Sequence, residues 1–227
     1  MTPLDLLDEP EFSTHGVLPG VTIGKVTSVE DPEKLGRVRV RIARLSDQAE
    51  THWARVLRPA AGAAHGLHLP IEKDDEVLVA FADGQPEFPI VLGALWSSKV
   101  PPLVEEAKRQ DHRTLTSRSG HTIRLDDTAD AEKIEILDKT GKNSLTFDTA
   151  NNTVTIASAD KIVLQAAKAL HIASADAELT IDCKVLTLTA TDGATIAAGA
   201  IALESDDTVS INGPSGVTIN DGALEVK

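Results

Sequence analysis

NTVTIASADKIVLQAAKALHIASADAELTIDCKVLTLTATDGATIAAGAIALESDDTVSINGPSGVTINDGALEVK, residues 152–227, is the stretch that decides the fold. Pairs of apolar residues, mostly two positions apart around a polar or small residue, recur in it about every eight residues. The second members of these pairs are Ile156, Leu164, Ile172, Ile181, Leu188, Ile196, Leu203, Ile211, Ile219 and Val226. A fixed period indicates a structural repeat, and alternation with a period of two is typical of half-buried strands. A helix is excluded, because its apolar positions recur every three or four residues.

Geometry limits what this repeat can form. One turn of a single-chain β-solenoid must enclose a packed interior, and eight residues cannot close around one, so other chains must supply the missing sides. Three copies that each give one segment per turn would bring the apolar pairs to a common axis and pair every strand edge. We therefore predict an intertwined three-chain β-helix, a homotrimeric needle. The axial positions are Ile156, Leu164, Ile172, Ile181, Leu188, Ile196, Leu203, Ile211 and Ile219.

A monomeric antiparallel meander with five-residue strands and three-residue turns has the same period and is the alternative. Two features count against it. Such tight turns need residues with positive φ, yet several repeats contain no glycine. No aromatic residue follows Phe147, whereas a two-layer sandwich usually has some.

Charge and composition narrow the function classes. The formal net charge is −13, which argues against nucleic acid as a partner, since phosphate binding needs clustered Lys and Arg. One cysteine, Cys183, precludes an intrachain disulfide and suits a reducing compartment, where we expect a small packed side chain. The first residues, 1–11, hold Asp5, Asp8 and Glu9 and lack the pattern of a signal peptide. We expect synthesis in the cytoplasm and no membrane span.

The N-terminal part predicts a small closed barrel. Five segments rich in β-branched or aromatic residues are separated by turn signals, among them Asp31-Pro32-Glu33 with Gly36 and Asp83-Gly84. The predicted strands are Val21–Val29, Arg37–Ile42, His52–Val56, Glu76–Phe81 and Ile90–Trp96. Five strands in about eighty residues favour an oligonucleotide- and oligosaccharide-binding (OB) barrel over residues 16–96. The predicted fold class is thus all-β, an OB barrel followed by the trimeric β-helix.

Four blocks carry a family resemblance. VEDPEKLGRVRV (29–40), WARV (53–56), DEVLVAF (75–81) and PIVLGALW (89–96) resemble the N-terminal barrel of contractile-injection spike proteins. That family includes the phage baseplate assembly protein V group, the central spike of T4-like tails and the C-terminal half of VgrG proteins. Further on, SGHTIRLDD (119–127) and GKNSLTFD (141–148) are similar to the start of the β-helix in VgrG-like spikes. The resemblance covers about residues 16–227.

The resemblance implies an organisation and a role. We expect an N-terminal tail (1–15), the barrel (16–96), a linker (97–118) with a helical turn over 103–110, and the spike (119–227). The linker is too short for the lysozyme domain that some members carry. The implied function is that of a structural spike at the baseplate of a phage tail, tailocin or related particle, which punctures the target cell envelope. The alternatives are a VgrG-like spike that carries effectors, a glycan-binding OB module and a cell-wall enzyme.

Partners follow from the same resemblance. A hub protein is expected at the barrel end. The chain ends without a metal-binding His-x-His tip, so we expect a blunt end covered by a PAAR-like tip protein, with Leu224 and Val226 near the contact. The apolar tail is a candidate for docking on the hub and contains Leu4, Leu6, Leu7 and Phe12.

No residues are predicted to be catalytic, to bind a cofactor or to hold a metal. His65 and His68 fall in a glycine-containing loop with no third ligand of suitable spacing. Asp126-Asp127 and Asp206-Asp207 are expected at exposed corners, and residues 148–152 at a turn. Ser119 and His121 are not predicted to form a nucleophile with its base.

Overall fold

The computed structural model describes residues 20–45, 48–175 and 178–215. Every regular element in these ranges is a β-strand except two single-turn 3-10 helices, η1 (Ala82–Gly84) and η2 (Glu106–Lys108). The predicted all-β class is confirmed, and η2 lies where a helical turn is expected before the spike. The chain divides into two units, residues 1–163 and 164–227, which are described separately.

The first five strands form one sheet with the order β2-β1-β4-β5-β3. They are β1 (Val21–Ser28), β2 (Arg39–Arg41), β3 (Arg55–Val56), β4 (Glu76–Phe81) and β5 (Pro89–Ala94). β3 pairs with β5 in parallel, and the other pairs are antiparallel. Val38 and Ala54 exchange backbone hydrogen bonds of 3.0 and 2.8 Å, which join the β2 edge to the β3 edge. This arrangement agrees with the expected OB-like barrel.

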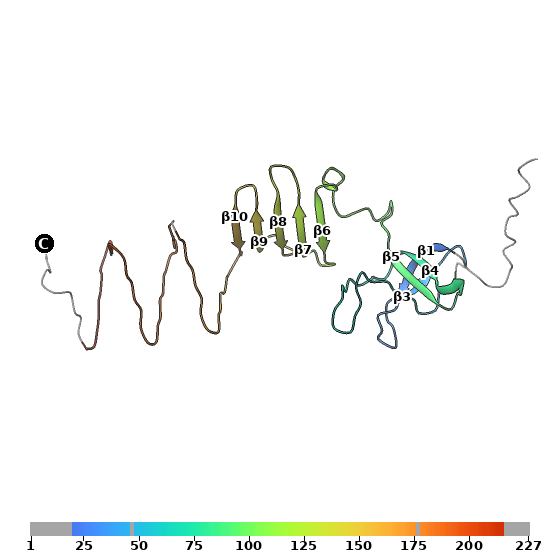
Figure 1. Cartoon of the computed structure of the whole chain (residues 1–227), viewed down its shortest axis with the longest axis horizontal. Coiled ribbons are helices and arrows are strands. Elements are labelled where there is room, and N and C mark those ends of the chain that lie inside the picture. The colour runs from blue at the N-terminus through green and yellow to red at the C-terminus, as the bar shows by residue number, and fades with distance from the viewer. Residues whose placement is uncertain (1–19, 46–47, 176–177, 216–227) are drawn as a thin grey trace, which may run out of the picture. The chain divides into compact units, whose positions relative to one another are not determined.

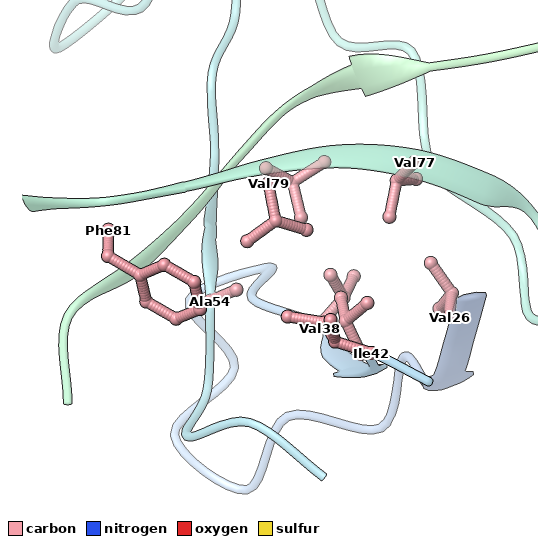
Figure 2. Close-up of a cluster of buried hydrophobic side chains, with 9 residues drawn as sticks. Val26, Val38, Ile42, Ala54, Val77, Val79 and Phe81 are labelled. Carbon is pink, nitrogen blue, oxygen red and sulfur yellow. The ribbon is translucent and has the colours of Figure 1, made fainter. Parts of the chain in front are cut away.

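The barrel core is aliphatic with one aromatic ring, and Figure 2 shows its side chains converging between the strands. Its buried members are Val26, Val38, Val40, Ile42, Ala54, Val77, Val79, Phe81 and Val91. Gly24 of β1 is required by a close approach, because a Cβ atom there would lie 2.3 Å from Cγ1 of Val40. The predicted strand ends differ mainly at β2 and β3, which are shorter than expected.

A second five-stranded sheet follows, with the order β10-β9-β8-β7-β6 and every neighbouring pair antiparallel. Its strands are β6 (His112–Thr116), β7 (Thr122–Asp126), β8 (Lys133–Leu137), β9 (Ser144–Asp148) and β10 (Thr153–Ala157). The four connections each contain a residue with positive φ: Gly120, Asp130, Gly141 and Asn152. β6 lies inside the stretch predicted as linker, and Ser119 and His121 lie in the β6–β7 turn rather than on a strand.

After β10 the described backbone forms no strand or helix, and every residue from 158 to 175 and from 178 to 215 is exposed. The backbone bends at regular intervals and runs extended between the bends, as the zigzag trace in Figure 1 shows. The bends fall at residues 159–160, 167–168, 175, 184, 191–192, 199, 206–207 and 214–215. Their spacing of about eight residues is the period of the apolar pairs.

Candidate assembly surface

One face of the β6–β10 sheet is apolar across all five strands, and we call it the apolar face. The register places the apolar residues in two rows that run across the strands. The first row is Leu115, Ile123, Ile136, Leu145 and Ile156, and the second is Leu125, Ile134, Phe147 and Val154. Because side chains two apart on a strand share a face, both rows lie on the same side of the sheet.

No second layer covers the apolar face within the described residues. Its side chains keep 41% (Phe147) to 60% (Val154) of their surface exposed, apart from half-buried Leu145. A sheet with one apolar side normally buries that side against another element. An exposed apolar surface that extends across five strands marks an interaction site in a soluble protein.

The opposite face of the same sheet is polar and contains the better-buried side chains. Glu135 and Asp126 are each only 8% exposed. The Nε of Arg124 donates to Oε2 of Glu135 at 2.8 Å, and Nζ of Lys133 lies 3.4 Å from its Oε1. Nε2 of His112 lies 3.1 Å from Oδ2 of Asp126. This face has its own charge partners, so it has no need of an apolar cover.

The ion network corrects one expectation. Asp126 and Asp127 were both expected at an exposed corner, but only Asp127 is exposed, where it pairs with Arg113. Asp126 ends β7 and accepts a hydrogen bond of 2.6 Å from the Thr128 hydroxyl, which lowers the pKa of its carboxyl group. Its burial was missed because an Asp-Asp pair resembles a surface turn in sequence.

The turns of the sheet are held by carboxylates. Asp138 accepts hydrogen bonds from the Thr140 hydroxyl and from the Asn143 side-chain amide, and these bonds lower the pKa of Asp138 to about 2. Asp148 accepts hydrogen bonds from the backbone N–H and the side-chain amide of Asn151, in the turn expected at residues 148–152. His121 accepts a hydrogen bond at Nδ1 from the Lys139 backbone N–H, 3.2 Å away. These hydrogen bonds fix the conformation of the turns.

The predicted axial residues divide into three groups. Ile156 lies on the apolar face, in a strand that pairs with β9 of the same chain rather than standing alone. The next seven are 62–80% exposed and lie on the extended segments between bends: Leu164, Ile172, Ile181, Leu188, Ile196, Leu203 and Ile211. Ile219, like the proposed tip contacts Leu224 and Val226, lies outside the described residues.

The other side chains considered for metal binding or catalysis lie in exposed loops and bends of the described ranges. No group of three or more His, Cys, Asp or Glu residues there is placed to hold a metal ion. His65 and His68 lie in an exposed loop, and Asp206-Asp207 lie at a bend, both as expected. Cys183, expected to be packed, is exposed on the described chain. The two short helices fall far below the length of a membrane crossing, and no other helix is present in the described part.

One comparison with known proteins bears on the barrel. Residues 22–96 match the family model described as type VI secretion system/phage-baseplate injector OB domain. Except for Val21, the match covers all five barrel strands, and it supports a relation between the barrel and baseplate spike proteins. The description places OB domains of this kind in type VI secretion systems and in phage-baseplate injectors.

Proposed function

We propose that this chain is the homotrimeric central spike of a contractile injection machine, and that it punctures the target envelope when the sheath contracts. The observation that carries the proposal is the set of bends in residues 158–215, whose spacing matches that of the apolar pairs. Extended segments that repeat their apolar residues in phase, and that have no partner in the described chain, need partners from other chains.

Backbone chemistry supports the same reading. The last residue with positive φ in the described part is Asn152, in the β9–β10 turn. Without such residues the chain cannot form the tight hairpins of a meander, so the extended segments after β10 do not pair with one another. Their N–H and C=O groups remain available to neighbouring copies. Three copies would complete the ladders and leave no lateral strand edge open.

Apolar burial supplies the driving force. Burying a large aliphatic side chain fully is worth about 1.5–3 kcal/mol, and the exposed aliphatic residues of the sheet and the repeats realise this only on association. The apolar face of the β6–β10 sheet is the first surface we expect to be shared between copies. The axial residues Leu164 to Ile211, with Ile219 beyond the described part, would extend the shared core along the needle.

Mechanical work follows from such a needle. A rod in which each chain hydrogen-bonds to its neighbours cannot bend without breaking many bonds together, so it transmits an axial push to its tip. Neither a cofactor nor a catalytic residue is needed for this work.

We propose one partner at the barrel and a second partner at the C-terminal tip of the spike. The hub is expected at the barrel, where the outward side of β1 presents Val21 and Ile23, 57% and 56% exposed. In register with them, Ala80, Leu78 and Ile90 of β4 and β5 continue an aliphatic surface. Loss of Ile23→Glu spikes from isolated baseplates would support this contact, and normal incorporation would contradict it. A PAAR-like protein is proposed to cover the tip through Leu224 and Val226.

The test is the solution mass of the full chain by light scattering. The expected mass is three times the 24.0 kDa of one chain. Proteolysis of the assembled protein between residues 97 and 111, ahead of β6, should then release barrels and leave a trimeric core that begins near His112. A full chain of monomeric mass at micromolar concentration would reject the proposal.

The matched family description also names type VI secretion, which keeps a VgrG-like spike that carries effectors as the second candidate. Co-purification of effector proteins with the assembled spike from its native host would favour that role over a phage tail or tailocin.

A further inference from the structure

The barrel contains a pocket of about 730 Å³ whose lining is unusually basic for this chain. Arg37, Arg55, Arg58, His52 and His68 line it, and Glu87 is the one acidic residue among the described residues that do so. The whole chain, by contrast, has a formal net charge of −13. A basic pocket on an acidic protein selects an anionic ligand.

Two of the three guanidinium groups have no carboxylate partner among the described residues. Arg37 is already neutralised, because its NH2 group lies 2.8 Å from Asp31 and 3.1 Å from Glu33. Arg58 donates to the backbone carbonyl of Leu69, a neutral acceptor. The Arg55 side chain makes no hydrogen bond or ion pair with any described residue. Arg55 and Arg58 therefore lack a carboxylate partner within the described ranges.

Aromatic side chains line the same pocket. Phe88 is 57% exposed although it lies beside β5, and Trp53 is half-buried. The guanidinium of Arg39 lies 5.0 Å from the centre of the Trp53 ring and holds it in place. The pocket thus offers guanidinium groups for carboxylates and the exposed ring of Phe88 for an apolar side chain. This combination suits an acidic peptide with aliphatic or aromatic anchors better than a small inorganic anion.

A segment of this composition precedes the barrel. Residues 1–19 contain four carboxylates, Asp5, Asp8, Glu9 and Glu11, with no Lys or Arg. Interleaved with them are the apolar residues Leu4, Leu6, Leu7 and Phe12. Fully extended, nineteen residues span roughly 60 Å, whereas a domain of about 75 residues has a radius of gyration of about 11 Å. From its attachment before β1 the segment can reach any point on the barrel surface.

We propose that residues 4–12 bind in this pocket, with their carboxylates on Arg55 and Arg58 and an apolar side chain against Phe88. Tethering places the segment at an effective concentration in the millimolar range, so weak contacts suffice for occupancy. The contact does not depend on the trimer. It would anchor the N-terminus on the barrel and weaken as salt screens the charges.

The experiment uses the full chain with Arg55→Lys, which keeps the charge and supplies an amine. A carbodiimide joins amines to carboxylates that form an ion pair, and mass spectrometry identifies the joined peptides. The amine introduced at position 55 is expected to couple to Asp5, Asp8, Glu9 or Glu11 about tenfold more than the native, exposed Lys99 does. The yield should fall several-fold in 0.5 M NaCl and in a version that also carries Phe88→Ala.

Mixing isotopically labelled and unlabelled chains shows whether the segment binds its own barrel or that of a second copy. Coupling within one chain supports the proposal, and coupling only between chains would overturn it. Coupling of the introduced amine only to Glu87, or to the N-terminal segment no more than Lys99 does, would overturn it.

Discussion

Neighbouring residues of β10 provide a matched test of the proposed trimer. Ile156 lies on the apolar face, and Thr155 lies on the polar face of the same strand. Both side chains are exposed on the described chain, so neither substitution disturbs an existing core. We expect Ile156→Asp to abolish the trimer and Thr155→Asp to leave it intact.

The magnitude follows from exposure. Ile156 keeps 59% of its surface exposed, which an interface between copies would cover. At about 1.5–3 kcal/mol for full burial of such a side chain, the uncovered part is worth about 1–2 kcal/mol per chain, or about 3–5 kcal/mol for three chains. Ile156→Ala should therefore lower the trimer association constant by about 10²–10⁴-fold. Ile156→Asp should cost more, because three carboxylates would share an apolar site.

Sedimentation equilibrium over a range of concentrations measures these changes directly. Ile156→Asp should sediment as a monomer at pH 7 and regain part of its association near pH 4, where protonation removes the charge. Equal association of the Ile156→Asp and Thr155→Asp proteins would refute the assignment of the apolar face to the interface.

Three further predictions concern the folded chain. The hydrogen bonds that lower the pKa of Asp138 to about 2, against 3.8 for the ordinary group, stabilise the sheet while its carboxyl group is ionised. This stabilisation should be complete above pH 4 and should be lost as the pH falls toward 2. Acid unfolding followed by circular dichroism should show a smaller decrease in stability for Asp138→Asn. Gly24→Ala should lower the melting temperature, since overpacking costs about 1–3 kcal/mol, whereas Gly93→Ala, with no atom within 4 Å of the added Cβ, should change it little. Arg124→Leu should destabilise the sheet by about 3 kcal/mol in urea unfolding because Glu135 loses its main partner, and Arg124→Leu with Glu135→Leu should recover most of that loss.

The barrel was the most predictable part of the fold. β4 matches its predicted bounds at Glu76–Phe81, because an apolar run between charged turns has few other interpretations. The predicted length of β3 was too great. The strand covers only Arg55–Val56, and Ala54 forms a single bridge to Val38 instead of extending the ladder. The basic pocket was not predicted because Arg37, His68 and the pair Arg55 and Arg58 come from separate segments of an acidic chain.

The β6–β10 sheet was harder to anticipate, because strands of an intrachain meander and of an interchain needle have the same alternating pattern. The difference lies in the connections. Gly120, Asp130, Gly141 and Asn152 adopt positive φ and allow hairpins, whereas no described residue after Asn152 does so. Residues with positive φ occur in every turn between β6 and β10, so the meander extends to β10 and the unpaired repeat begins only after it. The alternating pattern shows which face of a strand is apolar, whereas the connections decide whether its neighbour belongs to the same chain.

The evenly spaced bends have a consequence for how such chains change length. If each eight-residue segment adds one strand to a stack, it adds about 4.8 Å, the spacing of neighbouring strands. Duplication or loss of whole segments would then lengthen or shorten the rod in discrete steps while every side chain kept its orientation. An insertion of one residue would turn all later side chains to the wrong side. The number of eight-residue segments would thus set the length of the rod, and the gene could gain or lose coding sequence in multiples of eight codons.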